Sequence, residues 1–541
     1  MDRYGLDSDG LRVSPDWQLS RLVGPSPLFG ANGMQFGPDG RLFVAQAFGS
    51  QVSAIDVDTG ACEAVVPVGG PIVGPDDVSF DSKGTLYVTE VMSARVSARF
   101  PDGSTKVIAA DVPAANGITV HQDRIFMDEF RPGGRLFELF ADGRTPRLIA
   151  ADLPMPNALC VGPDQWLYFP AVAAGEIWRV PIGGGAAERF VDGLDHPTAV
   201  KFDRQGRMLT VQAGSGDVTR IDLPSRAKTH VIRVRPGIDN LALSVDGRLF
   251  LSHFVDGGVA EIAAGGVERT VVGPGFIGPM GIAVGSAGEI YVADGLSIAV
   301  ISTDGTCSRA GHLLQPGFPG FVRGVAVAQD GVLRLTNSAG DVVVYRPGQP
   351  AQTLASGLGE LYDLAVLPDG GLLAVDAAEG RLLRLTPKGE VSTLARGLSR
   401  PKGVAVASDG SVYVSESGKG RVVFVDGGVT PVLEGLGEPH GIAISQQVLY
   451  VVDRARKTLT ALTLDQRRTT ETVATGLSVG GAPGVVVKPL PGLPGIIPGP
   501  IGAFAGLAAS SNGSLYVAAD GEGSVLQLVR LSKSARRHDG K

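Results

Sequence analysis

The chain has 541 residues, 44% of them hydrophobic, and a formal net charge of −7 at neutral pH. Its Lys and Arg residues are scattered, so the sequence lacks the basic patch that indicates nucleic-acid binding. The 77 Gly and 36 Pro residues indicate frequent turns rather than disorder, because apolar residues are plentiful. A chain of this length exceeds one ordinary hydrophobic core, so several domains or an array of repeats is expected.

The N-terminal residues and the cysteines bear on the cellular compartment. Residues 1–10 lack a basic segment followed by an apolar one, which is the pattern of a secretory signal. No uninterrupted apolar run reaches the length of about 18 residues that a membrane-spanning helix needs. Cys62, Cys160 and Cys307 are single and widely spaced, so we expect three buried thiols that bind no metal. Together these features favour a cytoplasmic protein.

One sequence unit, first seen at residues 31–44, recurs along the chain. It begins with a polar and a small residue, Asn32 and Gly33, and continues as a short strand that turns through Pro-Asp-Gly into a second strand. Recurrence at intervals of about 41 residues, with strand signals throughout, predicts the four-stranded blades of a β-propeller. The residues that open the twelve units are Asn32, Asp76, Asn116, Asn157, Thr198, Asp239, Met280, Arg323, Tyr362, Lys402, His440 and Ala505.

Twelve blades fit either one ring or two rings of six. Residues 17–23 resemble the last strand of a blade but precede the first unit, whereas 524–529 resemble a third strand without a fourth. A propeller closes when one blade takes strands from both ends of its sequence, which removes an exposed sheet edge. We expect two rings, because six blades leave a channel narrow enough for the opening residues of several blades to meet around one small ligand.

The sequence therefore predicts an all-β fold of two tandem six-bladed β-propellers. Residues 17–23 would close the first ring, and a strand near 269–272 would close the second. The predicted parts are a loosely held N-terminus at 1–16, a first propeller at 17–266, a second propeller at 267–530 and a basic tail at 531–541.

A Pro- and Gly-rich apolar insertion at residues 480–503 lengthens the last interval between units. Its prolines exclude a helix or an interior strand. We expect a loop packed over the second propeller or a lid, because apolar loops are seldom left in water. A homodimer contact and a membrane-surface contact are the alternatives.

The opening residues of the first six units share an oxygen-bearing side chain. Ca²⁺ binds six to eight oxygens and accepts amide carbonyls as readily as carboxylates. Asn and Asp also cap turns, but five such residues at one blade position favour a metal site. The predicted metal ligands are Asn32, Asp76, Asn116, Asn157 and Asp239.

Polar residues also end the second strand of most blades, on the same face of the propeller as the opening residues. In the second half they are nearly uniformly acidic, which suggests a structural role in satisfying backbone N–H groups. Glu90, Asp128, Glu129 and His253 break that uniformity and are therefore the candidates for acid–base chemistry. The full set is Gln46, Glu90, Asp128, Glu129, Gln212, His253, Asp294, Asn337, Asp376, Glu416, Asp453 and Asp520.

The opening residues of the second half include the cations Arg323 and Lys402 together with Tyr362 and His440. They would repel a metal ion, so we expect a mainly structural ring in which they pair with acids at nearby strand ends. The expected acidic partners include Asp376, Glu416 and Asp453. An anion-binding or catalytic site is the alternative.

The run Asn32-Gly33-Met34-Gln35-Phe36-Gly37-Pro38-Asp39-Gly40 resembles the signature of the gluconolactonase and regucalcin family, and residues 75–78 resemble that of its next blade. The resemblance implies a six-bladed propeller that hydrolyses lactones with a divalent metal, often Ca²⁺, held by Glu, Asn and Asp, with an Asp as base. Asn32 and Asp76 would be metal ligands. The family's ligand Glu falls at Asn157, and this replacement weakens the site by one negative charge. Its substrate-contacting Asn falls at Asp239.

Two further resemblances broaden the functional alternatives. Residues 279–284 with 290–294, and 401–406 with 412–416, resemble NHL repeats, and Glu90 after Leu-Tyr-Val-Thr resembles the streptogramin lyase branch. The favoured function is metal-dependent hydrolysis of a lactone or related ester in the first propeller. A metal-dependent lyase or isomerase and a non-catalytic binding scaffold are the alternatives. The catalytic candidates are Asp76, Asp239, Glu90, His253 and Asp128.

Overall fold

The computed structural model describes residues 10–263, 265–481 and 502–531. This part of the chain is built almost entirely of β-strands, with two single turns of 3-10 helix at Val172–Ala174 and Ser417–Lys419. Among the described residues, no helix has the length and hydrophobicity required to cross a membrane. The prediction of an all-β fold is confirmed.

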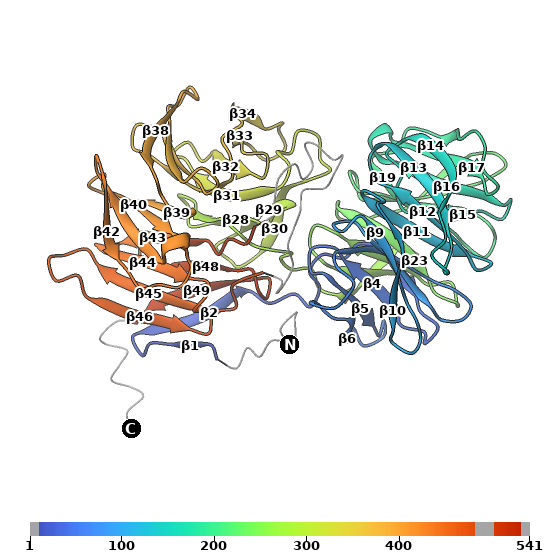
Figure 1. Cartoon of the computed structure of the whole chain (residues 1–541), viewed down its shortest axis with the longest axis horizontal. Helices are drawn as coiled ribbons and strands as arrows, with labels where there is room; N and C mark the ends of the chain where they lie inside the picture. The colour runs from blue at the N-terminus through green and yellow to red at the C-terminus, as the bar shows by residue number, and fades with distance from the viewer. Residues whose placement is uncertain (1–9, 264, 482–501, 532–541) are drawn as a thin grey trace. The chain divides into compact units, whose positions relative to one another are not determined.

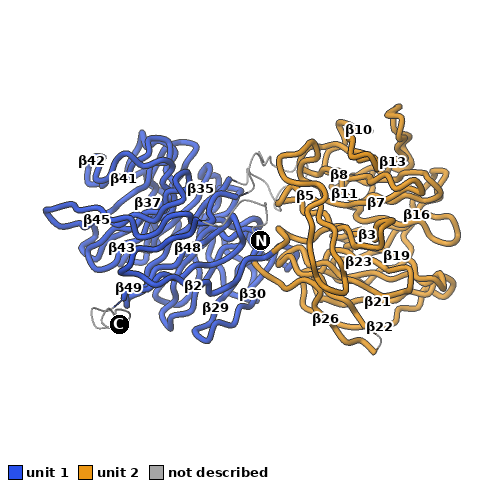
Figure 2. Tube along the Cα trace, turned by 90° about the horizontal axis from the view of Figure 1, so that it is seen from below, with its two compact units in different colours: residues 1–26, 276–481, 495–541 blue, residues 27–275, 482–494 orange. Residues whose placement is uncertain are grey.

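The chain divides into two compact units, and Figure 2 shows them in different colours. Among the described residues, unit 2 consists of 27–275 and unit 1 of 10–26, 276–481 and 502–531. The described residues form twelve antiparallel sheets, six in each unit. Eleven of these sheets have four strands, which agrees with propeller blades, and the remaining sheet has a fifth strand.

Unit 2 contains six sheets of consecutive strands. They are β3 (Met34–Phe36), β4 (Leu42–Gln46), β5 (Gln51–Ile55) and β6 (Cys62–Val66); β7 (Pro75–Phe80), β8 (Leu86–Glu90), β9 (Arg95–Arg99) and β10 (Thr105–Ala110); β11 (Ala115–His121), β12 (Arg124–Glu129), β13 (Pro132–Leu139) and β14 (Arg147–Pro154); β15 (Cys160–Val161), β16 (Trp166–Ala171), β17 (Glu176–Pro181) and β18 (Glu188–Val191); β19 (Pro197–Phe202), β20 (Met208–Gln212), β21 (Asp217–Ile221) and β22 (Lys228–Arg233); and β23 (Ile238–Leu243), β24 (Leu249–His253), β25 (Val259–Ala263) and β26 (Val267–Val272). The innermost strands contact one another in the order β3, β7, β11, β15, β19 and β23, and β23 contacts β3, so the circuit closes.

Unit 1 contains four sheets of consecutive strands and two that recruit strands from the N-terminus. The strands are β1 (Arg12–Val13) and β2 (Trp17–Val23); β27 (Ile282–Val284), β28 (Ile290–Ala293), β29 (Ser297–Ile301) and β30 (Cys307–His312); β31 (Val322–Val327), β32 (Leu333–Asn337), β33 (Val342–Tyr345) and β34 (Gln352–Ala355); β35 (Leu361–Val366), β36 (Leu372–Asp376), β37 (Arg381–Leu385) and β38 (Val391–Arg396); β39 (Pro401–Val406), β40 (Val412–Glu416), β41 (Arg421–Val425) and β42 (Val429–Leu433); β43 (Pro439–Ser445), β44 (Val448–Asp453), β45 (Thr458–Thr463) and β46 (Thr470–Thr475); and β47 (Leu507–Ala509), β48 (Leu515–Ala519) and β49 (Ser524–Arg530). The innermost strands β27, β31, β35, β39, β43 and β47 also form a closed circuit.

The two ends of the chain meet in one sheet of unit 1. Strand β2 pairs antiparallel with β49, with Trp17 opposite Arg530, and completes the sheet β2-β49-β48-β47 (Figure 1). Strand β1 adds a fifth strand to the next sheet, beside β46. Trp17 packs edge-on against Tyr450, with the ring centroids 5.9 Å apart. Unit 2 is therefore inserted into the sequence of unit 1, after β2.

This arrangement corrects the predicted boundaries. Residues 17–23 do not close the ring of residues 27–275, because the free edge of β49 requires a fourth strand and β2 supplies it. The strand predicted to close the second ring is β26, which instead completes the last sheet of unit 2 by pairing with β25. The N-terminus at 1–16 is also not loosely held throughout, since β1 lies within it.

The hydrophobic core lies between neighbouring sheets, because successive side chains of a strand face opposite sides. In β12, Met127 packs with Tyr87 and Val96 of the preceding sheet, and Phe126 packs with Leu167 and other residues of the following sheet. Sheets with neighbours on two sides are thus buried on two faces, which explains why the second strand of each sheet is largely apolar, as in β4, β8 and β48.

Two other expectations differ from the structure or fall outside it. Cys307 is exposed, and Cys62 and Cys160 are half-buried, so the three thiols are not all core residues. Positions 482–501 of the predicted insertion at 480–503, and positions 532–541 of the basic tail, lie outside the described residues. The roles predicted for them stay predictions.

The pairing of β2 with β49 predicts unequal behaviour of fragments. Residues 27–275 contain every strand of their own six sheets, so this fragment should be soluble and unfold cooperatively. Residues 276–531 lack β2 and leave the edge of β49 open, so this fragment should aggregate or lose several kcal/mol of stability. Size-exclusion chromatography and thermal unfolding followed by circular dichroism would measure both.

A permuted fragment is the matched control, with residues 10–23 joined by a flexible linker after residue 531. It should recover the solubility that 276–531 lacks, because the added segment again supplies β1 and β2. Equal stability of 276–531 with and without this segment would contradict the role assigned to β2.

Candidate functional site

The opening residues of unit 2 stand at the same end of its six innermost strands. Asp76, Asn116 and Asp239 are the second residues of β7, β11 and β23. Asn116 is buried, whereas Asp76 and Asp239 keep part of their surface accessible. The strands therefore bring these side chains to one opening of the ring, as the repeat pattern predicts.

Carboxyl groups gather at this opening. Burial raises the pKa of Asp76 well above its ordinary range, and the nearby Asp239, Asp77 and Asp128 carboxyl groups raise it further. A side-chain hydrogen bond with Asn116 acts in the opposite direction. Burial, reinforced by Asp77, raises the pKa of Asp239 to about 7. The site is thus a set of mutually repelling carboxyl groups, which holds either protons or a cation near neutral pH.

Sequence analysis missed Asp77, which links two neighbouring sheets. Its Oδ1 accepts a hydrogen bond from the N–H of Val78 at 2.8 Å, and its Oδ2 accepts one from the N–H of Ile118 at 3.1 Å. Asp363 of unit 1 binds Leu364 and Val404 in the same way. The sequence signal that could have identified Asp77 is an acidic residue directly after the opening residue, at a position where several other units have glycine.

Asp128 occupies a position that hydroxyl groups fill in other sheets. The Thr89 hydroxyl accepts from the N–H of Asp77 at 3.0 Å and donates to the carbonyl of Asn116 in the next sheet, and Ser252 forms the same bridge. Asp128 Oδ1 accepts from the N–H of Gly117 at 3.0 Å, but its buried Oδ2 has no hydrogen-bond partner among the described residues. Burial raises the pKa of Asp128 to about 8, so a neutral carboxyl that can donate is favoured at pH 7.

Other predicted metal ligands already accept hydrogen bonds from backbone N–H groups. Asn157 Oδ1 accepts from the N–H of Ala158 at 2.8 Å, and Asn32 Oδ1 lies 3.5 Å from the N–H donor of Ala47. The hydroxyl of Thr198 donates to a backbone carbonyl at 3.4 Å. These contacts favour the turn-capping role, and metal binding by Asn32 and Asn157 stays a prediction.

Glu90 and Glu129 are fully buried, and both carboxylates are bound to structural partners. Glu90 accepts from the N–H of Val73 at 2.7 Å and pairs with Arg95 at 2.7 Å, and Glu129 pairs with Arg131 and Arg135. Gln46 and Gln212 bind the backbone of the preceding loop just as Glu90 does, at 2.7 Å in both cases. Since a neutral amide performs this role, it does not require a titrating group, and the position is structural.

The same role is confirmed for most strand-end acids of unit 1. Asp294, Asp376, Glu416, Asp453 and Asp520 accept hydrogen bonds from backbone N–H groups of the loops that lead into the innermost strands. Asp376 and Glu416 also pair with Arg381 and Arg421. These acids are therefore occupied by structural partners.

His253 is fully buried at the end of β24, and neither of its ring nitrogens has a hydrogen-bond partner in the described part of the chain. Burial lowers its pKa to about 3, so the ring is neutral near pH 7. It pairs through its backbone with Ile238, next to Asp239. Its catalytic role stays a prediction, and proton donation from a charged ring is disfavoured.

The donor set at the opening suits a cation only in part. No group of three or more His, Cys, Asp or Glu residues within the described ranges is arranged to hold a metal ion. Asp76, Asp239 and Asn116 nevertheless supply two carboxylates and an amide, which are the oxygen donors that Ca²⁺ prefers. Metal binding by these three residues stays a prediction.

The opening residues of unit 1 are buried and have partners other than those predicted. The Tyr362 hydroxyl donates to Glu360 Oε1 at 2.6 Å, and His440 Nε2 lies 3.6 Å from Glu438 Oε1. Pairing with Asp376, Glu416 and Asp453 was the expectation, and it is wrong because those acids bind arginines and backbone at the strand ends. Glu360 and Glu438 precede the opening residues by two positions and were missed.

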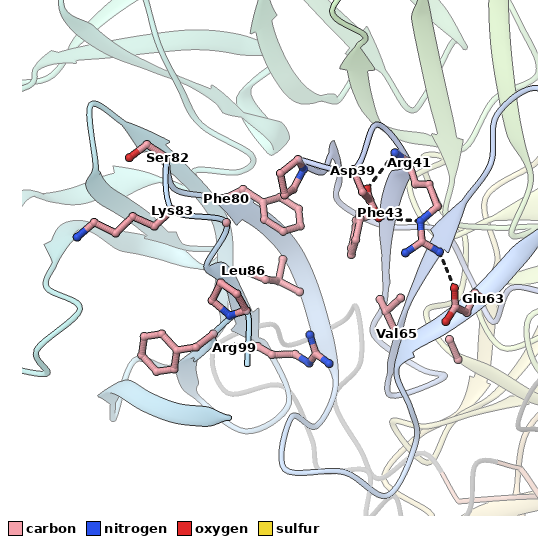
Figure 3. Close-up of a pocket in the computed structure, with 15 residues that line it drawn as sticks. Asp39, Arg41, Phe43, Glu63, Val65, Phe80, Ser82, Lys83, Leu86 and Arg99 are labelled. Atoms are coloured by element: carbon pink, nitrogen blue, oxygen red, sulfur yellow. Dashed lines mark hydrogen bonds and ion pairs between the residues drawn. The ribbon is translucent and has the colours of Figure 1, made fainter. Parts of the chain in front are cut away.

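A cavity of about 620 Å³ lies at the other end of the unit 2 strands. Figure 3 shows Asp39 and Lys83, from the turns after β3 and β7, on opposite sides of it. Arg41 is held there by Asp39 and Glu63, at 2.8 and 2.5 Å. The cavity contains none of the predicted site residues, so it is separate from the carboxyl cluster.

The bridging position of Asp128 yields a prediction. Asp128→Asn keeps a neutral acceptor and donor, so above about pH 8 the variant should be at least as stable as the parent protein. Asp128→Ala should lose about 1–3 kcal/mol, because the N–H of Gly117 loses its partner. A raised pKa means that the parent loses stability as pH rises from about 4 to about 8. Urea unfolding across this range would measure the slopes.

The matched control is Asp246→Asn, which alters an exposed acid in the turn of another sheet. It should leave the pH dependence unchanged. Lower stability of Asp128→Asn than of the parent protein above about pH 8 would show that the carboxylate itself is required.

The comparisons with known proteins point to the family that the opening motif resembles. Over 203 residues the chain is 27% identical to a gluconolactonase of Zymomonas mobilis subsp. mobilis; the match covers 34% of this chain and 50% of that protein. The chain thus matches about half the length of this relative. No model of a protein family matches the chain. The resemblance to the gluconolactonases is confirmed at this level.

Solved structures of low identity include two of interest. Regucalcin of Agrobacterium tumefaciens str. C58, described as a calcium-binding protein, is 18% identical, with 42% of this chain and 84% of that chain covered and a TM-score of 0.36. An inactive virginiamycin B lyase of Staphylococcus aureus with quinupristin is 15% identical, with 59% and 96% covered and a TM-score of 0.34. At these values neither carries a functional argument.

Proposed function

We propose that each unit is a six-bladed β-propeller and that unit 2 hydrolyses a lactone or a related ester at the opening of its ring. The observation that carries the proposal is the pair of partly accessible carboxyl groups of Asp76 and Asp239 at this opening. Burial raises the pKa of both groups, and the Asp239 carboxyl group raises the pKa of Asp76 further. The likeness to a gluconolactonase supports the class of substrate. A carboxylate pair at one opening supports hydrolysis, because ester cleavage requires a group that removes a proton from water.

Asp239 is the group best suited to act as the base. Its pKa of about 7 leaves a substantial carboxylate fraction at neutral pH and matches the range in which a base is most effective. Asp76 has the stronger tendency to keep a proton, so it would hold the attacking water or donate to the leaving oxygen. Asn116, which is hydrogen-bonded to Asp76, would fix the orientation of that carboxyl group.

We propose that Asp76, Asp239 and Asn116 would also hold a divalent cation with the oxygen preference of Ca²⁺. Such an ion would polarise the ester carbonyl and lower the pKa of a water molecule. Binding a cation would offset the repulsion among the carboxyl groups and lower their pKa values. The charge of the protein site thus favours an ion even though its ligand set is small.

The proposal is tested by activity toward aldonolactones and simple esters. Asp76→Asn and Asp239→Asn preserve side-chain size but remove the charge, so each should lower kcat/KM by at least about 100-fold. Chelation should lower activity, added Ca²⁺ should restore it, and elemental analysis should find less bound metal in both variants. Initial rates from pH-stat titration of the released acid would measure the effect.

Asp246→Asn provides a matched control, since it removes an exposed acid from the same sheet as Asp239 at the opposite end of β23. It should retain the activity of the parent protein. Full activity in both Asp76→Asn and Asp239→Asn would place the reaction elsewhere and overturn the proposal.

A further inference from the structure

The ring opening of unit 1 holds a second group of buried ionisable residues. Four consecutive innermost strands have an ionisable side chain at their second residue, and all four side chains are buried: Arg323, Tyr362, Lys402 and His440. The Lys402 Nζ atom lies 3.1 Å from the centroid of the Tyr362 ring, and the Arg323 guanidinium lies 4.8 Å from it. Two cationic side chains therefore contact one aromatic ring inside the channel.

Lys402 has no counter-charge in direct contact. Within the described residues, its ammonium makes no hydrogen bond or ion pair, and its close partner is the face of Tyr362. The acids that could pair with it are otherwise bound: Glu360 accepts from the Tyr362 hydroxyl, and Glu438 pairs with Arg454 at 2.7 Å. A ring face attracts a cation, but it does not replace an anion or water as a partner for three N–H donors.

His440 adds a neutral donor beside Lys402. Its Nδ1 accepts from the N–H of Ala505 at 3.2 Å, so the neutral ring carries its proton on Nε2. Nε2 is buried and makes no hydrogen bond, since Glu438 Oε1 is 3.6 Å away. The ring stacks on Phe504, with centroids 6.0 Å apart. Phe504 also packs against Tyr362, so aromatic rings flank both donors.

We propose that the ring opening of unit 1 binds a small organic monocarboxylate, with Lys402 as its cationic ligand, His440 Nε2–H as a second donor, and the rings of Tyr362 and Phe504 as apolar walls. This inference does not rest on the function proposed for unit 2. A single negative charge is favoured, because Glu360 and Glu438 lie close enough to influence Lys402 and would repel a dianion such as phosphate.

The charge state of Lys402 makes the binding dependent on pH. Burial lowers the pKa of Lys402 to about 7. Among the charged groups that face it, Glu360 and Glu438 favour the charged form, and Arg323 and Arg400 oppose it. The rings of Tyr362 and His440 also face the ammonium group. Burial lowers the pKa of His440 to about 4, so that ring stays neutral while Lys402 titrates. A carboxylate should therefore bind more tightly at pH 6 than at pH 9.

Isothermal titration calorimetry on the full chain tests the proposal with sodium benzoate, sodium gluconate and sodium phosphate as probes. At least one carboxylate should bind saturably with a Kd below about 1 mM at pH 6, and its affinity should fall at least tenfold by pH 9. Lys402→Met should weaken it at least tenfold at pH 6, whereas Lys388→Met, which removes an exposed lysine, should not. Phosphate binding tighter than either carboxylate would overturn the proposed class of ligand.

Stability without ligand separates a binding site from a purely structural stack. A buried ammonium without a counter-charge is unfavourable, so Lys402→Met should raise the Tm at neutral pH. The parent should gain stability between about pH 7 and pH 10, because the unfolded chain then binds the proton that folded Lys402 has lost, and the variant should lack this gain. A lower Tm for Lys402→Met, or wild-type protein that binds neither carboxylate at pH 6, would overturn the proposal. Lys402→Gln serves if the first variant does not fold.

Discussion

The innermost strands of each unit contact one another in a closed circuit around the ring, and the rest of the structure depends on this contact. The N–H of Gly33 donates to the carbonyl of Asp76, and the N–H of Gly281 donates to the carbonyl of Arg323. In unit 1 the circuit closes when the N–H of Gly506 donates to the carbonyl of Met280. A Cβ atom at Gly281 would lie 2.6 Å from the Arg323 carbonyl oxygen, so the close approach requires glycine. Because their backbones are fixed in this way, the opening side chains gather at one end of the ring.

The same backbone circuit carries two different chemistries. In unit 2 the opening residues are Asn, Asp and Thr, and the result is a set of carboxyl groups whose pKa values rise because they are buried and lie near other carboxyl groups. In unit 1 they include Arg323 and Lys402, and the pKa of the lysine falls because it is buried beside other cations. Neither ring balances its own charge at the opening. That imbalance, rather than the fold, is the feature that suggests a ligand in each unit.

The repeat made the blades and their opening residues predictable from sequence, because strands, turns and periodicity are local properties. The partner of residues 17–23 was not predictable to the same degree, because β2 pairs with β49 across nearly the whole chain and the pattern of either strand fits several edges. Asp77, Glu360 and Glu438 were missed because they stand one or two positions away from the opening residues. Whether such a residue faces the ring depends on the neighbouring sheet, and the sequence of one repeat does not contain that information.

A comparison of the acids at the strand ends with those at the ring opening shows which of them the fold itself requires. Glu90 and Glu416 each satisfy a loop N–H group and an arginine, and Gln46 shows that an uncharged side chain serves the same loop position. Among the described residues, neither Asp76 nor Asp239 forms an ion pair with an arginine or lysine. Placing these carboxyl groups at the ring opening therefore lowers the free energy of unfolding without a compensating ion pair. Residues that a fold retains at such a cost are better explained by chemistry than by architecture. By this criterion we propose that the acids at the ring opening, and not the more numerous acids at the strand ends, are the functional ones.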